Sequence, residues 1–298
     1  MRIYTIIVTY NAMRWIERCL SYLKASTVQT VPVMIDNGST DGTRDFIPEH
    51  YPEVVWLPQE KNLGFGQGNN VGIRYALEHE ADYILLMNQD VYLSDDAIER
   101  MLAVSDGHTL LSPVHLNGDG TRLDKMFRYL MNECDTLILD DILTTGKLSP
   151  SYVIGRVSAA CWFLPVAVIR EIGGFNPLFF HYSEDDNYLN RLTFHSVKTM
   201  LVPEAKMNHD REEHGNVCVF NRNRLHRDIL LVSCNINLSW RGRLVKYLRR
   251  LYECYAWDLP RKAYRPFGWL REILWMIAHQ TMINDSRRRE KEKGLTWL

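Results

Sequence analysis

Short apolar runs alternate with amphipathic helical patterns through the first third of this 298-residue sequence. The apolar runs are IYTIIVT (3–9), VPVMI (31–35), EVVWL (53–57) and YILLMN (83–88), and helical patterns follow the first run over 14–24 and the third over 67–79. Strands that are separated by helices cannot pair as hairpins, so they pair side by side in one direction. The alternation therefore predicts an α/β fold with a mostly parallel, doubly wound central sheet and flanking helices.

The same logic extends to about residue 210, with one interruption. The expected elements are a helix over 95–104, strands over 109–114, 157–165 and 197–203, and helices over 166–172 and 183–195. Between Leu116 and Ser151 the pattern loosens into Gly, Asp and Thr with one helix over 125–133, which predicts an insertion or flap. We expect one sheet domain over 1–215 and a helical extension over 216–298.

The extension differs from the rest of the chain in charge and in aromatic content. Residues 240–298 contain 14 Lys and Arg against 6 Asp and Glu, whereas the whole chain has 35 and 36. A helical stripe begins at Leu244 and contains Tyr247, Leu248, Leu251, Tyr252 and Tyr255, with arginines beside it. Basic amphipathic helices rich in Trp and Tyr suit a membrane surface. Packing of the helices on the sheet domain explains the stripe equally well, and the sequence leaves both interpretations open.

Composition places the protein among cytoplasmic globular proteins. The six cysteines are widely spaced and include no C-x-x-C pair, which favours reduced thiols. The first apolar run is too short for a signal peptide, and no window has the roughly 18 apolar residues that a membrane span needs. We expect a cytoplasmic location, at the inner face of the membrane if the extension binds lipid. The acidic body and the absence of a recognisable module argue against nucleic acid as a partner.

Polar clusters follow four of the expected strands, each at the carboxyl end. They are Thr9-Tyr10-Asn11, Asp36 to Thr43, Glu60 to Gly72, and Asn88-Gln89-Asp90. Each cluster alone is ordinary turn chemistry, and Asp41 in particular suits the cap of the helical segment that follows it. Four clusters at one edge of a sheet instead indicate a shared crevice, which is where open α/β sheets bind nucleotides.

These clusters, together with the later segment GGFNPLFFHYSEDDNYLNR, resemble the inverting family-two glycosyltransferases with the GT-A fold. Within that family the sequence is similar to the rhamnosyltransferase-like branch, which builds bacterial cell-surface polysaccharide. The resemblance covers roughly residues 1 to 210 and implies a GT-A fold with a Rossmann-like sheet. It also implies transfer of a sugar, with rhamnose as the leading candidate, from a nucleoside-diphosphate donor to a hydroxyl of a glycan or lipid-linked acceptor.

The resemblance further implies a set of donor-binding residues. Asp36 matches the carboxylate that accepts a hydrogen bond from the nucleotide base. The glycines of the third cluster would let the backbone approach the donor. The full set is Thr9, Tyr10, Asn11, Asp36, Asn62, Gly64, Phe65, Asn69, Asn70, Asn88, Gln89 and Arg191.

A divalent cation, Mg²⁺ or Mn²⁺, is the implied cofactor. The family usually has Asp-x-Asp where this chain has Asn88-Gln89-Asp90, so one carboxylate is replaced by an amide. Asp90 is the implied metal ligand, and His209 matches a position that often adds a metal or diphosphate ligand. Mg²⁺ needs only one or two protein carboxylates beside phosphate oxygens, so Asp90 can serve without a second Asp. A lone His is also commonly structural.

The implied catalytic group is the triplet Glu184, Asp185 and Asp186 at the start of an expected helix. Acidic residues in a first helical turn are also favoured by the helix dipole alone. In the family the Asp that matches Asp185 is the general base, which takes the proton from the acceptor hydroxyl. Where the family commonly has a further Asp, this chain has Asn187, so the division of roles within the triplet stays open. Arg191 could pair with the triplet or contact the leaving phosphate.

Two other functions fit parts of the sequence. A non-catalytic sugar-nucleotide-binding protein would explain why Asn88 and Asn187 replace carboxylates. A nucleotidyltransferase would share the fold and the acidic edge, but it should have a glycine-rich motif with Lys or Arg after the first strand, where this chain has Thr-Tyr-Asn-Ala. A metal-assisted inverting glycosyltransferase remains the prediction from the sequence.

Overall fold

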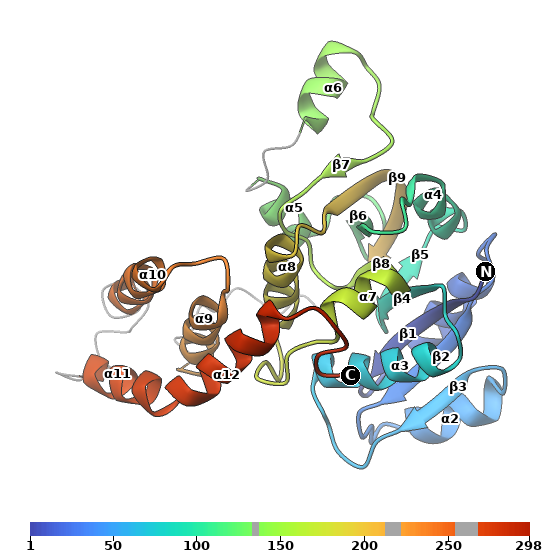
Figure 1. Ribbon diagram of the computed structural model, residues 1–298. Coiled ribbons are helices and arrows are strands. Elements are labelled where there is room, and N and C mark those ends of the chain that lie inside the picture. The colour runs from blue at the N-terminus through green and yellow to red at the C-terminus, as the bar shows by residue number, and fades with distance from the viewer. Residues whose placement is uncertain (133–136, 212–221, 254–267) are drawn as a thin grey trace.

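The structure is a computed structural model that describes residues 1–132, 137–211, 222–253 and 268–298 (Figure 1). The strands are β1 (Ile3–Thr9), β2 (Val31–Asp36), β3 (Val55–Pro58), β4 (Tyr83–Asn88), β5 (Val91–Leu93), β6 (Leu110–Asn117), β7 (Tyr152–Val153), β8 (Cys161–Pro165) and β9 (Thr199–His209). The helices are α1 (Ile16–Lys24), α2 (Thr43–His50), α3 (Phe65–Glu78), α4 (Ala97–Val104), α5 (Lys125–Asn132), α6 (Ile138–Thr144), α7 (Val166–Ile172), α8 (Glu184–Phe194), α9 (Arg222–Cys234), α10 (Trp240–Glu253), α11 (Gly268–Ala278) and α12 (Gln280–Lys291).

One sheet runs through the molecule in the order β3-β2-β1-β4-β8-β6-β9-β5, with β7 paired to β9. The pairs among β3, β2, β1 and β4 are all parallel, as the strand and helix alternation predicts. Beyond β4 the sheet is mixed, because β8 runs antiparallel to both β4 and β6 and β5 runs antiparallel to β9. The parallel half is thus the half that carries the predicted crevice.

The order of strands in the parallel half fixes where the crevice lies. From β1 the chain moves through β2 to β3 on one side and then returns to place β4 on the other side of β1. This reversal separates the loops that follow β1 and β4, and such a switch point is where α/β sheets bind ligands. The parallel register sets Thr9 beside Asp36 and Val8 beside Asn88.

Both faces of the sheet are covered by apolar clusters, which explains why the strands read as continuous apolar runs. In β1, Tyr4 and Ile6 face one cluster, which includes residues from α3, α7 and α8, while Ile3 and Ile7 face the other, which includes residues from α1 and α4. The free cysteines Cys19, Cys161 and Cys234 are all buried. Cys134, Cys218 and Cys254 lie outside the described residues.

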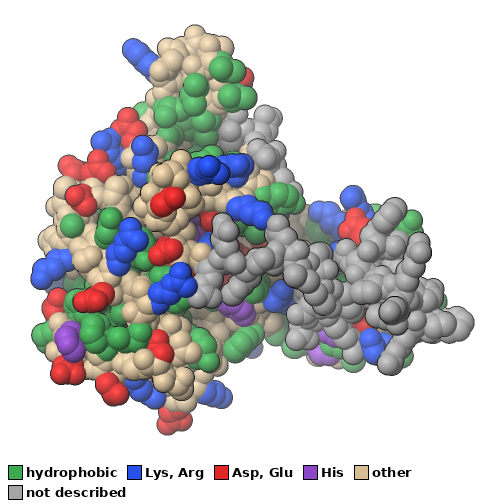
Figure 2. All heavy atoms as spheres, turned by 180° about the vertical axis from the view of Figure 1, so that it is seen from behind, with side chains coloured by type: hydrophobic (Ala, Val, Ile, Leu, Met, Phe, Trp, Pro, Cys, Tyr) green, Lys and Arg blue, Asp and Glu red, His purple; other side chains and the backbone are tan. Residues whose placement is uncertain are grey.

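The segment expected to be an insertion projects from the sheet domain. Helix α5 forms where a helix was expected, and it lies on β6. Helix α6, which the sequence analysis did not predict, stands out at the top of the molecule (Figure 1). Leu137, Leu139 and Leu143 on this projection are 63%, 63% and 74% exposed, and hydrophobic side chains are visible on it in Figure 2.

The extension forms a helical layer that contacts the sheet domain. Tyr247 and Leu251 of α10 are buried against Leu225 and Ile229 of α9. Leu244, Leu248 and Tyr252 are exposed, so the predicted stripe is divided between a packed face and an open face. Tyr255 and the expected boundary at residue 215 lie outside the described residues. In the part that the structure describes, no helix is long and apolar enough to cross a bilayer.

The chain then returns to the sheet domain. Helix α12 packs on α8 and α9, and the last residues reach the turn after α7. There the Gly174 amide donates to the Thr296 carbonyl at 2.8 Å, and the Gly294 amide donates to the Glu171 carbonyl at 2.8 Å. Packing of the extension on the core, one of the two interpretations left open by the sequence, is therefore present for α9 and α12.

Candidate active site

A cavity of about 400 Å³ lies at the carboxyl ends of β1 and β4, at the predicted switch point. Seven of the predicted donor or metal residues line it, namely Tyr10, Asn62, Gly64, Phe65, Asn88, Gln89 and Asp90. Four residues that the prediction did not include also line it, namely Val8, Asn37, Phe180 and His181. The tertiary structure thus brings together residues from five separate stretches of the chain.

Gln89 joins the two strands of the switch point through their loops. Its side-chain oxygen accepts from the Tyr10 amide at 2.8 Å, and its side-chain nitrogen donates to the Tyr10 carbonyl at 3.2 Å. Both polar ends of the Gln89 amide are therefore occupied by the backbone of the β1 loop. The Tyr10 side chain stays 49% exposed and free to meet a ligand at the cavity.

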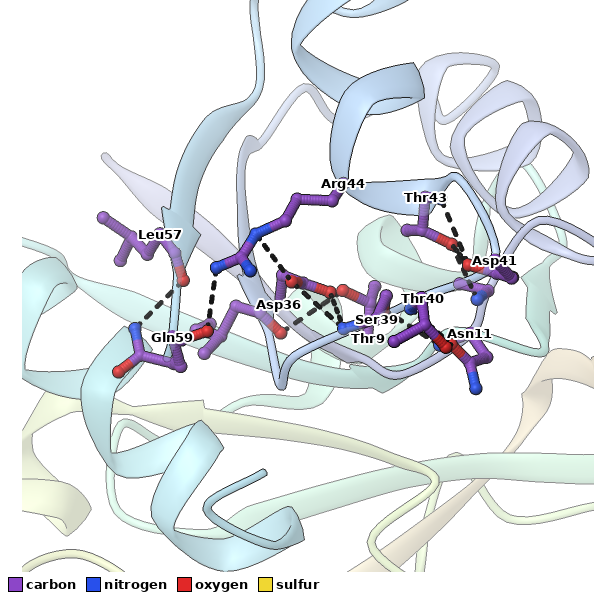
Figure 3. A network of polar contacts seen from close by, with 12 residues as sticks. Thr9, Asn11, Asp36, Ser39, Thr40, Asp41, Thr43, Arg44, Leu57 and Gln59 are labelled. Carbon is purple, nitrogen blue, oxygen red and sulfur yellow. Dashed lines mark hydrogen bonds and ion pairs between the residues drawn. The ribbon is translucent and has the colours of Figure 1, made fainter. Parts of the chain in front are cut away.

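Figure 3 shows a polar network that fixes the loops after β1 and β2. The Asn11 side-chain oxygen accepts from the Thr40 amide at 2.8 Å, which holds Asn11 at a φ of 51°. Asp41 accepts from the Thr43 amide at 3.1 Å and from the Met13 amide at 3.0 Å, so it ties the start of α2 to the β1 loop. The N-cap position itself is occupied by Gly42, one residue after the expected Asp41. The network makes the two loops one rigid unit beside the cavity.

Thr9 and Asp36 are part of this rigid unit and do not line the cavity. The Thr9 hydroxyl donates to the Ile35 carbonyl at 3.3 Å. The fully buried Asp36 carboxylate accepts from the Ser39 amide at 3.2 Å and lies 3.6 Å from the Arg44 Nε (Figure 3). Binding of the nucleotide base by Asp36 stays a prediction, and it requires the carboxylate to add a ligand to these partners.

The glycine-rich loop packs tightly against protein. A Cβ on Gly64, where φ is +80°, would lie 2.0 Å from the Phe180 carbonyl oxygen, and a Cβ on Gly66 would lie 2.9 Å from the Phe175 Cβ. Asn62 accepts from the Gly64 amide at 2.8 Å, and Asn37 donates to the Gly64 carbonyl at 3.2 Å. The glycines therefore admit neighbouring backbone and side chains, a close approach that the sequence analysis assigned to the donor.

Asn69 and Asn70 point away from the cavity. Asn69 donates to the Phe65 carbonyl at 3.0 Å within α3. The Asn70 amide is fully buried and bonds both the Phe175 carbonyl at 2.8 Å and the Phe175 amide at 2.7 Å. Neither side chain lines the cavity, because Asn69 bonds within α3 and Asn70 bonds the turn after α7.

Asn88 and Asp90 line the cavity with side-chain oxygens that could bind a cation. The Asn88 side-chain oxygen is buried and has no hydrogen-bond partner. Asp90 Oδ1 lies 3.3 Å from His209 Nε2, because β5 begins beside the end of β9 and pairs Val91 with His209. Burial raises the pKa of Asp90, but the hydrogen bond from His209 and the nearby Arg211 outweigh it and hold the pKa below its usual value.

These oxygens fit a hard divalent cation better than the histidine does. Asp90 supplies a carboxylate and Asn88 an unused carbonyl oxygen, both of which suit Mg²⁺ or Mn²⁺ beside a diphosphate. Arg211 lies 2.8 Å from His209 Nδ1, and an arginine only donates, so the imidazole carries its proton on Nε2 toward Asp90. His209 could ligate a metal through Nε2 only after Arg211 left Nδ1. Among the described residues, no three His, Cys, Asp or Glu side chains converge on one point.

The acidic triplet opens α8, and its first residue is the third after His181, which lines the cavity together with Phe180. None of its three side chains lines the cavity itself. Asp186 accepts from Arg156 Nε at 2.9 Å and from Nη2 at 2.6 Å, so its charge is paired. Arg156 was not predicted, and nothing in its sequence surroundings marks it.

Glu184 and Asp185 both have raised pKa values, and in each case burial is the largest cause. Burial, then the neighbouring Asp185 charge, raises the pKa of Glu184 to about 8, and its Oε2 is buried without a partner. Burial, then the Asp186 charge, raises the pKa of Asp185 to about 6, although the amides of Asp186 and Ala159 favour its charged form. Near pH 7 Glu184 is therefore mainly protonated and Asp185 mainly ionised.

Arg191 does not reach the cavity or the triplet, which corrects the prediction that it binds the donor or the leaving phosphate. It is buried, and its guanidinium donates to the carbonyls of Gly174 and Ile172. Its Cζ lies 4.6 Å from the centre of the Trp297 ring. The side chain thus holds the turn after α7 against the C-terminus.

The four lining residues that were not predicted differ in whether the sequence carries a signal that could have identified them. Asn37 lies inside a cluster that was singled out, and Phe180 and His181 belong to the aromatic run that precedes the triplet. Val8 is an apolar strand residue, and only the pairing of β1 with β4 places it beside Asn88.

Comparison with known proteins agrees with this geometry. The family model described as Glycosyl transferase family 2 matches residues 4–173. An N-acetylglucosaminyl-diphospho-decaprenol L-rhamnosyltransferase of Mycobacterium tuberculosis is 28% identical over 228 residues, which are 68% of this chain and 74% of that protein. The dTDP-rhamnosyl transferase RfbF of Shigella flexneri is 22% identical over 295 residues, which are 97% of this chain and 90% of that protein.

Solved structures share the fold at low sequence identity. Residues 1–349 of S. aureus TarS superpose with a TM-score of 0.60 at 14% identity, over 98% of this chain and 90% of that one. GalNAc-T7 with UDP, GalNAc and Mn²⁺ superposes with a TM-score of 0.66 at 12% identity, over 100% of this chain and 55% of that one. These likenesses show the GT-A fold that the resemblance implied. Because the family model matches more than half of the chain, the protein belongs to glycosyl transferase family 2.

Proposed function

We propose that the protein transfers a sugar, with inversion, from a nucleoside-diphosphate donor to a hydroxyl of a glycan or lipid-linked acceptor. The observation that supports this most directly is the cavity at the switch point, where the unpaired Asn88 oxygen and the Asp90 carboxylate lie together. An orphaned buried carbonyl oxygen is costly unless a ligand or cation completes it. The diphosphate of a donor and its counter-ion would meet that need.

Asn88 and Asp90 would hold the divalent cation against the diphosphate. When bound, such a cation stabilises the negative charge that builds on the leaving nucleoside diphosphate. Tyr10, Asn62 and Phe65, which line the same cavity, would contact the nucleoside and its phosphates. The rigid network after β1 and β2 would keep those contacts in place without further ordering on binding.

Asp185 is the proposed general base. A base must be near the acceptor hydroxyl and able to lose its proton at working pH. Within the triplet, the pKa of Glu184 is raised to about 8 and Asp186 forms an ion pair with Arg156, which leaves Asp185, with a pKa of about 6, as the candidate. It would take the proton as the acceptor oxygen attacks the anomeric carbon from the side opposite the leaving group. Glu184 would stay protonated, and Asp186 with Arg156 would hold the start of α8.

Rhamnose carried by thymidine diphosphate is the proposed donor, because two relatives are named as rhamnosyltransferases. One of these is named for a diphospho-decaprenol substrate, which supports a lipid-linked acceptor. A cytoplasmic enzyme at the inner face of the membrane would meet both substrates.

The open face of α10 supports contact with that membrane. Trp240, Leu244, Leu248 and Tyr252 follow one another at intervals of four residues and are 63%, 43%, 51% and 66% exposed. Arginines such as Arg241 and Arg249 accompany them, and the extension is basic where the rest of the chain is acidic. An exposed apolar stripe with basic flanks complements an anionic lipid surface.

A non-catalytic sugar-nucleotide binder is the second candidate, since Asn88 and Asn187 stand where the family commonly has Asp. Turnover separates the two. Purified protein would be incubated with a panel of nucleoside-diphosphate sugars, with and without Mg²⁺ or Mn²⁺, and release of free nucleoside diphosphate would be followed. Wild type should consume one donor slowly in the presence of metal, and Asp185→Asn should not.

Asp45→Asn is the matched control, because Asp45 is also an acid in a first helical turn but lies exposed on α2. Equal loss in both variants would count against Asp185 as the base. Binding of a nucleotide without any turnover, in the presence of a lipid-linked acceptor, would favour the binder.

A further inference from the structure

The segment Phe179–Ser183, called the aromatic segment below, forms a wall of the cavity that comes from outside the parallel half of the sheet. Phe180 and His181 line the cavity. The Phe180 carbonyl oxygen occupies the space where a Cβ on Gly64 would be, 2.0 Å away. The aromatic segment therefore lies directly on the predicted donor loop, and its position determines the shape of the cavity.

Part of the backbone of the aromatic segment has a conformation that is unfavourable for residues other than glycine. Tyr182 and Ser183 have φ angles of +68° and +70°, consecutive left-handed residues that are not glycine. Such residues persist only when the surrounding structure holds them. The groups that hold the segment are therefore part of what keeps the cavity in shape.

Several of these groups belong to the helical extension. Phe179 is 1% exposed and packs with Leu230 and Cys234 of α9 and with Ile283 of α12. Arg227 of α9 donates from Nη1 to the His181 carbonyl at 3.2 Å, and its Cζ lies 5.0 Å from the centre of the Tyr182 ring. One guanidinium thus holds both the backbone and an aromatic ring of the segment.

We propose that Arg227 is a positioning residue for the donor cavity, and that through it the helical extension is part of the catalytic unit. That the ligand of the cavity is a sugar nucleotide rests on the proposed function. Without Arg227 the aromatic segment keeps the packing of Phe179, but it loses the hydrogen bond to the His181 carbonyl and the cation–π contact with Tyr182. Residues 180–183 then occupy several positions next to Gly64, and the donor binds to an incompletely formed cavity.

Arg243 provides a matched control within the same extension. Like Arg227 it donates from Nη1 to a backbone carbonyl, that of Ser233 at 3.3 Å, and in both arginines Nε is buried without a partner. Its carbonyl partner lies near the end of α9, next to Cys234, and among the described residues Arg243 has no hydrogen bond to the aromatic segment, whereas Arg227 bonds His181. Arg243→Ala removes the same kind of bond from the same helical layer, so any general loosening of the extension appears in both variants.

The experiment compares Arg227→Ala, Arg227→Lys and Arg243→Ala in the full-length protein by amide hydrogen exchange and by donor kinetics. Exchange needs no substrate, and the amides of 179–183 should be deprotected in Arg227→Ala and unchanged in Arg243→Ala. With dTDP-rhamnose as the probe, KM should rise about tenfold in Arg227→Ala, as expected for one charge-assisted hydrogen bond, with a smaller rise in Arg227→Lys.

The two readouts separate the two proposals. If wild type consumes no donor but exchange rises only in Arg227→Ala, the proposed function fails and the positioning role stands. If exchange at 179–183 is the same in Arg227→Ala and Arg243→Ala, or if their donor KM values rise equally, the positioning role is wrong.

Discussion

Asn187 of α8 donates from its side-chain nitrogen to Glu290 Oε1 of α12 at 2.8 Å, and both residues are about 1% exposed. Glu290 also accepts from Asn176 at 2.7 Å. The residue that departs from the family's usual Asp is thus the partner of a buried carboxylate from the extension. The departure therefore has a structural reason in this chain and is not by itself a sign of lost catalysis.

Asn187→Asp should destabilise the protein, because it sets two buried carboxylates against each other. We expect a loss of about 3 kcal/mol in the free energy of unfolding at pH 7, of the size found when a buried charge loses its compensation. The pair would share one proton and the pKa values would be raised in the folded state, so the loss should shrink as the pH falls. Urea unfolding at pH 7 and pH 5 measures both effects.

Asn190→Asp is the control, since Asn190 on the same helix accepts from Asn235 at 3.1 Å and an aspartate can accept there too. Asn187→Asp combined with Glu290→Gln should recover most of the stability. A double variant as unstable as Asn187→Asp would mean that the two side chains do not interact as described.

Activity should depend on the ionisation of Asp185. Its pKa of about 6 means that the base is lost to protonation below that pH, so kcat/KM should fall about tenfold per pH unit below pH 6. Glu184→Gln should keep the activity within a few-fold near pH 7, because Glu184, with a pKa of about 8, is already mainly protonated there. A pH profile of wild type and this variant provides the measurement. An unchanged rate down to pH 5 would contradict the assignment.

Asn88→Asp should strengthen divalent-cation binding, because it adds a carboxylate beside Asp90 where the side-chain oxygen is now unpaired. We expect the apparent Kd for Mn²⁺ in the presence of nucleoside diphosphate to fall about tenfold, as one further charged ligand contributes on the order of 1.4 kcal/mol. Isothermal titration would measure it, with Asp90→Asn as the opposite change. If neither variant alters Mn²⁺ affinity, the cation does not bind at this pair.

Arg191→Met should lower stability and leave donor binding unchanged. It removes a buried guanidinium and leaves the carbonyls of Gly174 and Ile172 without this donor, at a cost of about 3 kcal/mol. Arg170→Met, at an exposed position on α7, should cost less than about 0.5 kcal/mol. Chemical unfolding and donor KM of both variants would be compared. A selective rise in KM for Arg191→Met would restore the donor contact that the sequence suggested.

The open face of α10 should bind anionic vesicles. Replacing Leu244, Leu248 and Tyr252 by Ser removes apolar side chains that are already exposed, so the fold should be retained while co-sedimentation with phosphatidylglycerol vesicles is lost. Wild type should also bind less in high salt and to neutral phosphatidylcholine vesicles. If the triple variant instead converts a dimer to a monomer with no vesicle binding in wild type, the face is a protein interface.

Much of the site could be predicted because the alternation of strands and helices along the chain indicates that the strands run in one direction. Apolar runs such as 83–88 end in polar clusters, and in a parallel sheet all such ends meet at one edge, so the strand pattern alone placed Asn88 and Asp90 at a ligand-binding edge. Their role at a metal was implied only by the resemblance to the family. The predicted metal and donor residues that line the cavity all belong to this group.

The alternating pattern of the chain was enough to predict the strands and helices of the parallel half, their common direction and the edge of the sheet where polar residues gather. It did not predict α6 or the antiparallel directions of β5 and β8. Only the tertiary structure decided which of those residues face the cavity, because the side a helix presents depends on what it packs against. Asn70 turns to Phe175 and Arg191 to Trp297 for that reason. The same holds for the hydrogen bonds of Arg227 with His181 and of Glu290 with Asn187, which join residues 46 and 103 positions apart, since hydrogen bonds between distant segments leave no periodic pattern in the chain.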